Sequence, residues 1–272
     1  GGTLGGWSVG EVMENLLALG GLGPYELGIL VIAALGTSVL SAVVGMAGGI
    51  TLLAIMLLFL EPLVAIPLHA VVQMVSNGSR TWVHRTHIQW RILWPYLVPL
   101  LPLGWLSLGL AERIPPDAAR VLIGLFVLVA TWRPAWMFLG SHPERTNPSL
   151  RFFGLGAVVG VLNVTLGATG PLIAPFFLNL GLSRFALIGT KAACQMGGHI
   201  AKIVVFGAVG FAYAQWLGVL VLLAASVIIG TMGGTLLLGR VSEVGFRHLY
   251  KTVLTLVALR LVLGQVAELT TP

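Results

Sequence analysis

The segment Gly45-Met46-Ala47-Gly48-Gly49 decides the fold of this chain, because it returns 122 residues further on as Gly167-Ala168-Thr169-Gly170-Pro171. The similarity runs without a gap from residues 45–83 to residues 167–205. Each copy places a glycine break inside apolar sequence and follows it with a helix that carries a polar stripe. One unit written twice in this way is typical of membrane transporters that hold their ligand between two repeats.

The composition is that of an integral membrane protein. Hydrophobic residues make up 57% of the chain and charged residues only 9%, and the mean hydropathy is +0.98. A soluble domain carries roughly 25% charged residues. The net charge of +6 is explained by the excess of Lys and Arg on the cytoplasmic side of membrane proteins, so it does not indicate nucleic-acid binding. A single cysteine, Cys194, excludes an internal disulfide.

The apolar runs predict an all-α polytopic membrane protein with eight long helices and two half-length helices. The chain divides into an N-terminal surface segment at 1–25, a first repeat at 26–139, a polar linker at 140–150 and a second repeat at 151–266. The half-length pieces, 50–60 and 172–180, each follow a glycine break. Glu11 and Glu14 are expected on a short surface helix of the N-terminal segment.

The charges of two corresponding loops bear on the orientation of the repeats. The loop at 84–91 contains Arg85 and Arg91, whereas the corresponding loop at 209–214 has no charged residue. Positive charge marks the cytoplasmic face, so this difference favours an inverted repeat of five segments each, with both termini outside. A parallel duplication of four plus four helices, which would put both loops on one face, is the alternative.

Polar residues form a stripe on the helix that follows each break. They are spaced by four, four and three residues, so each set shares one helix face. The members are His69, Gln73, Asn77 and Arg80 in the first copy and Lys191, Gln195, His199 and Lys202 in the second. Neither helix contains an acidic residue. Ionisable groups inside a membrane are costly unless they pair or line a wet cavity, so the stripes predict an anionic ligand that supplies the missing charge.

Different members of the stripes are expected to have different roles. We expect Lys191 to be the main cationic contact, and Gln73 and Gln195 to donate amide hydrogen bonds. Arg80 and Lys202 fit two interpretations equally well, because long cationic side chains near a helix end can also extend to the membrane surface.

The two stripe histidines also have two interpretations. His69 and His199 could pack between helices, or they could contact the anion or carry a coupling proton, since imidazole titrates near neutral pH.

The glycine breaks add backbone donors to this site. A break inside the membrane exposes N–H groups at the start of the short helix, and a helix N-terminus attracts anions. The alternative is close helix packing through small residues, which is common in membranes. The predicted substrate site near the bilayer midplane comprises Gly48, Gly49, His69, Gln73, Asn77, Thr169, Gly170, Lys191, Gln195 and His199.

Other functional classes lack support in the sequence. The scattered histidines do not form a metal site, no Gly-x-Ser-x-Gly or buried acidic pair suggests a hydrolase, and no Walker motif suggests ATP use. We therefore expect no cofactor and no enzymatic activity. The prediction is a secondary transporter driven by a proton or other ion gradient, with an anion channel or a membrane scaffold subunit as alternatives.

The duplicated break and the stretch at 112–124, Glu-Arg-Ile-Pro-Pro-Asp-Ala-Ala-Arg-Val-Leu-Ile-Gly, resemble the TauE/SafE family of sulfite and organosulfonate exporters and permeases. The resemblance covers most of residues 27–264. That family usually shows Gly-x-Gly-Gly-Gly, whereas the two copies here read Gly-x-x-Gly-Gly and Gly-x-x-Gly-Pro. The resemblance implies eight spans and a small sulfur-containing anion such as sulfite, a sulfonate or sulfoacetate. It also implies a bacterial cytoplasmic membrane, where the chain could assemble as a homo-oligomer.

Overall fold

The computed structural model describes most of the chain. The described residues are 3–4, 7–8, 20–44, 48–133, 135–136, 147–177, 180–237 and 243–270. The predicted surface helix with Glu11 and Glu14, the first break at 45–47 and most of the linker lie outside them. Near the N-terminus, β1 (Thr3–Leu4) pairs antiparallel with β2 (Trp7–Ser8).

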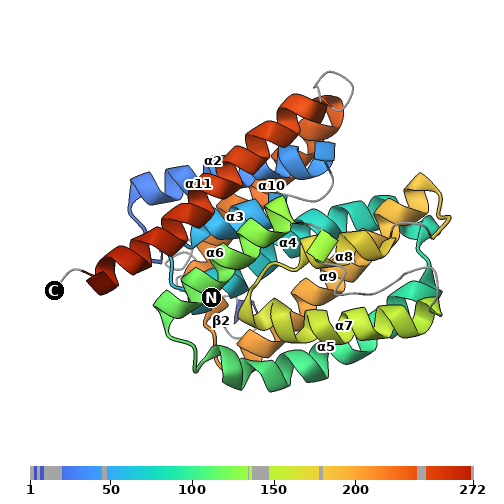
Figure 1. Ribbon diagram of the computed structural model, residues 1–272, viewed down its shortest axis with the longest axis horizontal. Coiled ribbons are helices and arrows are strands. Elements are labelled where there is room, and N and C mark those ends of the chain that lie inside the picture. The colour runs from blue at the N-terminus through green and yellow to red at the C-terminus, as the bar shows by residue number, and fades with distance from the viewer. Residues whose placement is uncertain are drawn as a thin grey trace.

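The described part of the chain is otherwise helical, with eight long and two short α-helices (Figure 1). The first half contains α2 (Pro24–Val44), α3 (Gly48–Met56), α4 (Pro62–Val83), α5 (Trp90–Ala111) and α6 (Pro116–Trp132). The second half contains α7 (Pro148–Thr165), α8 (Gly170–Ile173), α9 (Arg184–Ala208), α10 (Leu217–Leu237) and α11 (Glu243–Thr270). Short 3₁₀ turns are η1 (Arg85–His87), η3 (Ala174–Phe177) and η4 (Tyr213–Trp216). The predicted all-α membrane fold is confirmed.

Local sequence signals set where several helices start. Pro62, Pro116 and Pro148 lie in the first turns of α4, α6 and α7, where the missing proline N–H has no helical partner to lose. The Ser183 hydroxyl accepts a hydrogen bond of 3.3 Å from the N–H of Ala186 and so caps α9.

The second half-length helix is shorter than predicted. The apolar run at 172–180 forms only the four-residue α8 followed by the 3₁₀ turn η3. Pro175 lies within this stretch, and proline has no N–H for the α-helical ladder. The first short helix also ends early, at Met56 rather than residue 60.

Helices α5 and α7 lie side by side and run in the same direction (Figure 1). Gly156 lies against Tyr96, and one turn later Gly160 lies against Leu100. A Cβ atom at Gly156 would overlap the carbonyl oxygen of Tyr96. Glycine therefore allows the two backbones to approach closely, as in many membrane helix pairs.

Helices α2 and α10 form a similar parallel pair. Gly230 lies against Leu35, and one turn later Gly234 lies against Val39. A Cβ atom at Gly230 would overlap the carbonyl oxygen of Leu35. If the two halves of the chain are exchanged, the α5–α7 contact becomes the α10–α2 contact.

The helices α4 and α9, which occupy the same place in the two halves, pack antiparallel to each other. His84, just after α4, stacks on Phe185 at the start of α9, with ring centroids 5.7 Å apart. Further along, the rings of His69 and His199 meet edge to face, also at 5.7 Å. Equivalent helices run antiparallel when the repeats are related by an axis in the membrane plane, so this direction supports the predicted inversion.

The equivalent helices α6 and α11 are antiparallel too. A Cβ atom at Gly124, in the middle of α6, would lie 3.1 Å from the carbonyl oxygen of Ala258. The Trp132 indole at the end of α6 donates a 2.9 Å hydrogen bond to Thr255, earlier in α11. Both central pairs thus have the directions that an inverted repeat requires.

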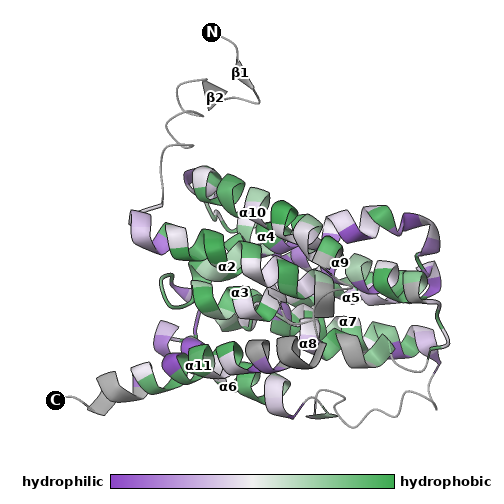
Figure 2. Cartoon of the chain, turned by 90° about the horizontal axis from the view of Figure 1, so that it is seen from above, coloured by the Kyte–Doolittle hydropathy of each residue, from purple (hydrophilic) through white to green (hydrophobic). Residues whose placement is uncertain are grey.

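The outer surface of the bundle is apolar. Figure 2 shows hydrophobic residues along the long helices and hydrophilic residues mainly near their ends. Ile32, Leu106, Ile229 and Leu236 are each more than half exposed. Among the described residues, four helices are long and apolar enough to cross a membrane, within Pro24–Ala42, Trp90–Ala111, Pro148–Thr165 and Tyr213–Gly234. Lipid chains would cover these apolar side chains, so the chain is an integral membrane protein.

Candidate functional site

A polar cavity of about 30 Å³ lies at the crossing of α4 and α9. Much of its wall is buried, since His69, Asn77 and Thr169 are each no more than 4% exposed, whereas Gly49, Arg80 and Gln195 are half-buried. A cavity of this size holds about one or two water-sized groups. Its lining is Ser41, Gly49, Ile50, His69, Gln73, Asn77, Arg80, Tyr96, Asn163, Ala168, Thr169, Gly170, Ile173, Gln195, Gly198 and His199.

The cavity brings together eight of the ten predicted site residues, from both halves of the chain. These eight are Gly49, His69, Gln73, Asn77, Thr169, Gly170, Gln195 and His199. Gly48 and Lys191 are not among the lining residues. Lys191 is half-buried on α9, one turn before Gln195.

Gly48 has a packing role. A Cβ atom at this position would overlap the carbonyl oxygen of Thr37 and the hydroxyl of Ser41. For Gly48, close helix packing is therefore a sufficient explanation. Gly49 differs because it lines the cavity, where a Cβ atom would lie 3.1 Å from Oε1 of Gln73.

His69 and His199 meet at the centre of the cavity. The Nε2 atom of His69 lies 2.8 Å from the carbonyl oxygen of Gly49, and because a carbonyl only accepts, Nε2 carries the proton and donates. Nδ1 of His69 and Nδ1 of His199 are buried without a hydrogen-bond partner among the described residues. Buried polar atoms of this kind normally have a partner, so both rings favour a polar ligand or water in the cavity.

Arg80 points toward the cavity rather than toward the membrane surface. Its guanidinium donates to the hydroxyl of Ser76 at 3.2 Å and to Oδ1 of Asn77 at 3.1 Å. Asn77 in turn donates from Nδ2 to the carbonyl of Gln73 at 2.9 Å. This chain of hydrogen bonds along α4 fixes the positive charge of Arg80 beside the cavity.

Lys202 lies in the protein interior, not at the membrane surface. It is 0% exposed, and its Nζ donates to the carbonyl oxygen of Gly167 in the second break. Lys202 is within electrostatic range of both His69 and His199. It therefore adds positive potential to the cavity without lining it.

Sequence reasoning missed several lining residues, of which Ser41 and Asn163 were recoverable. Asn163 donates to the carbonyl of Gly198 at 2.7 Å and accepts from the hydroxyl of Thr169 at 3.3 Å. Ser41 and Asn163 are separated by the repeat offset and lie four residues before their breaks. Extending the repeat upstream by four residues would have found both.

Tyr96 was not predicted either, and no repeated residue in the sequence would have identified it. Its hydroxyl is buried without a hydrogen-bond partner in the part of the chain that the structure describes. It lines the cavity from α5, which belongs to neither stripe.

The charges around the cavity have one sign. Arg80 lines it and Lys202 lies beside it, and none of the lining residues that the structure describes is an Asp or Glu. Gly49 and Gly170, in the first turns of the short helices α3 and α8, also line the cavity. Cations and amides without a carboxylate are groups that bind a small anion.

Comparison with known families supports the sequence resemblance. A family model described as Sulfite exporter TauE/SafE matches residues 30–261, which include both stripes and the second break. Searches of curated proteins and of solved structures give no significant match.

Proposed function

Because this chain belongs to the sulfite exporter TauE/SafE family, whose members are transporters rather than enzymes, we propose that it carries sulfite or an organosulfonate across the membrane. The proposal rests mainly on one observation, the buried cavity at the α4–α9 crossing with cations and amides but no carboxylate in its lining. We further propose that the membrane is a bacterial cytoplasmic membrane.

In the proposed site, the anion lies between the two halves of the chain. Arg80 supplies the direct positive charge, and Gln73 and Gln195 donate amide hydrogen bonds. Gly49, Thr169 and Gly170, with Asn77 and the two histidines, complete the coordination. Lys191, one turn from Gln195 along α9, is proposed to attract the anion on the side of the loop at 84–91.

The small volume favours an inorganic anion. A cavity of about 30 Å³ is small, so a bulky sulfonate would require larger movements than sulfite. A site that lies between the two halves of the chain also supports a carrier, with alternating exposure of the site, over a continuously open channel.

Transport by purified protein in proteoliposomes tests the proposal. We expect uptake of labelled sulfite that saturates and is accelerated by unlabelled sulfite inside the vesicles. Flux that rises linearly without such counterflow would favour the channel alternative. Absence of any flux or binding of sulfite and sulfonates would contradict the proposed function and favour a scaffold subunit.

We propose that a proton accompanies the anion and that His69 or His199 carries it, where their rings meet. An added proton between Arg80 and Lys202 is unfavourable in the empty cavity, and a bound anion would offset that repulsion. In the same vesicles, an internal pH dye should report protons moving with sulfite. Sulfite flux that leaves the internal pH unchanged at low buffer strength would contradict this coupling.

A further inference from the structure

A second, larger cavity opens near the start of α4. It has a volume of about 330 Å³, and we call it the vestibule. Its exposed rim carries Glu61, Glu112 and Arg113, whereas Ile66 and Ala111 are buried in its floor. Its full lining is Glu61, Pro62, Leu63, Ile66, Ala111, Glu112, Arg113, Ile114, Pro115, Pro116, Ala119 and Thr165. Charged side chains belong at a water-facing surface, so the vestibule opens to solvent at one membrane face.

The vestibule and the polar cavity are one helical turn apart. On α4, Ile66 faces the vestibule and His69 faces the polar cavity. At the end of α7, Thr165 lines the vestibule, and four residues later Thr169 lines the polar cavity. Three residues of helix rise by about 4.5 Å, so the wall between the two spaces is one layer of residues thick.

That layer is apolar and tightly packed. A Cβ atom at Gly167 would lie 2.7 Å from Cδ2 of Leu53 and 2.8 Å from Cγ1 of Ile66. Leu53 and Ile66 are almost fully buried, at 0% and 1% exposed. Gly167 adopts a φ of 78°, which favours glycine, and its carbonyl receives the Lys202 ammonium.

We propose that the vestibule is the access route to the anion site, and that Leu53, Ile66 and Gly167 form a gate that limits the size of the anion. The proposal rests on the proposed function above. Ile66 is then a specificity-determining residue that does not itself bind the anion. An apolar layer excludes hydrated anions until it moves. Lys202 donates a hydrogen bond to Gly167 in this layer and also adds positive charge beside the polar cavity.

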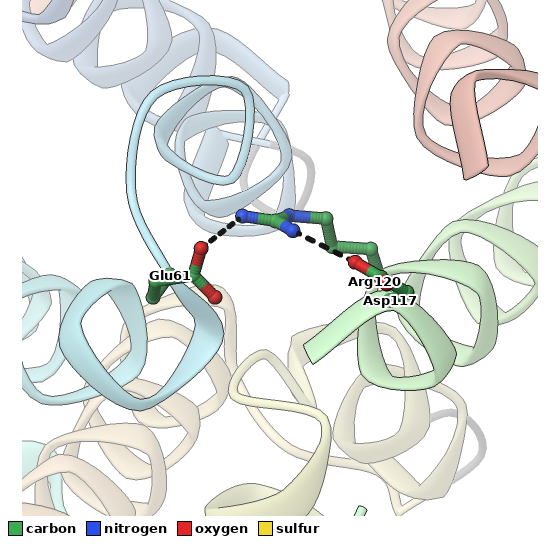
Figure 3. A network of polar contacts seen from close by, with 3 residues as sticks. All are labelled: Glu61, Asp117 and Arg120. Carbon is green, nitrogen blue, oxygen red and sulfur yellow. Dashed lines mark hydrogen bonds and ion pairs between the residues drawn. The ribbon is translucent and has the colours of Figure 1, made fainter. Parts of the chain in front are cut away.

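The mouth of the vestibule is held in place by ion pairs. Arg120 on α6 contacts Glu61 at 2.9 Å and Asp117 at 3.3 Å (Figure 3). The first contact joins α6 to the residue just before α4. The Arg120–Glu61 pair therefore links α6 to the start of α4 at the rim, and the gate lies below it.

Thiol accessibility tests the gate without requiring transport. Single cysteines replace Thr165 or Thr169 in a Cys194→Ser background, and the protein in nanodiscs is exposed to silver ions from both sides. Unreacted thiols are then counted by mass spectrometry after unfolding. We expect the Thr165→Cys thiol to react rapidly and the Thr169→Cys thiol to be protected. Adding Ile66→Ala should bring the reaction of the Thr169→Cys thiol close to that of Thr165→Cys.

Two further variants control this experiment. Leu68→Ala removes the same kind of fully buried side chain from α4, outside the layer, and should leave the Thr169→Cys thiol protected. Ile66→Val, which removes one methylene, should expose that thiol partially even if Ile66→Ala does not fold. Rapid reaction of the Thr169→Cys thiol with Ile66 intact would overturn the gate, as would continued protection in folded Ile66→Ala and Ile66→Val proteins.

Transport by the same variants separates the gate from the proposed function. Ile66→Ala should raise the uptake of methanesulfonate relative to sulfite severalfold, and an unchanged ratio would contradict the size limit. If thiol exposure follows Ile66 as expected but no variant moves any anion, the access route stands and the transport proposal fails.

Discussion

Arg80 is the residue on which anion affinity should depend most. A charge-assisted hydrogen bond contributes about 1.5–3 kcal/mol, so Arg80→Gln should weaken sulfite binding about tenfold or more. Calorimetry on purified protein measures this. Arg85→Gln is the matched control, because Arg85 is exposed and stacks over Trp82 at 4.6 Å, and it should bind sulfite normally.

Comparing Arg80→Gln with Lys191→Met tests where the main charge lies. The sequence predicts that Lys191→Met loses more sulfite affinity than Arg80→Gln. The structure favours the larger loss for Arg80→Gln, because Arg80 lines the cavity and Lys191 does not. Unchanged affinity in folded Arg80→Gln protein would contradict the assignment of Arg80 to the site.

Lys202 should affect binding more than stability. Lys202→Met removes a buried charge, which is often neutral for folding, but it also leaves the Gly167 carbonyl without its donor. We expect the free energy of unfolding to change by less than about 1 kcal/mol and sulfite affinity to fall about tenfold. A large loss of stability with normal affinity would show that Lys202 serves only to hold the break.

The α5–α7 pair gives the clearest prediction for a structural element. Gly156→Ala places a methyl group against the backbone of Tyr96, and such overpacking costs about 1–3 kcal/mol. Gly154→Ala, two residues earlier on the same helix, meets no atom within 4 Å and should be neutral or slightly stabilising. Unfolding titrations in mixed detergent micelles compare the two, and equal stabilities would contradict the close packing.

The elements were largely predictable, because the bilayer imposes a long apolar run on each spanning helix. Helix α4 ends at Val83, directly before the loop predicted at 84–91. The shortness of α8 was not predictable from hydropathy, since Pro175 just after it acts on hydrogen bonding and leaves the apolar run intact. The pairing of helices required glycine contacts such as Gly156 with Tyr96, which no local pattern in the sequence specifies.

The lining of the polar cavity was predictable where it repeats and not elsewhere. Periodicity placed Gln73 and Gln195 on the helix faces that line the cavity. Periodicity could not show that Arg80 turns inward, because a long cationic side chain near a helix end can point either way. Hydrogen bonds from Arg80 to Ser76 and Asn77 decide the direction. Tyr96 comes from a helix whose sequence reads as uniformly apolar.

For the whole molecule, the antiparallel crossing of α4 and α9 predicts the membrane topology. Helix α9 has 25 residues, a length of about 37 Å, so its two ends lie at opposite faces. The loop at 84–91 lies near the start of α9 and the loop at 209–214 follows its end. Cysteines at the exposed positions Thr86 and Ala212, in a Cys194→Ser background, should therefore react with an impermeant thiol reagent from opposite sides. Labelling of both cysteines from the same side would contradict the inverted repeat, and with it the proposed site between the two halves of the chain.

The central claim is that the transported anion binds at the α4–α9 crossing. Selenite has the pyramidal shape and charge of sulfite, and its selenium scatters anomalously. Crystals of the protein with selenite, at concentrations that compete with sulfite flux, should show one anomalous peak between His69, Gln73 and Gln195 that disappears in Arg80→Gln protein. A peak elsewhere in the protein, or an empty cavity while selenite still inhibits transport, would contradict the claim.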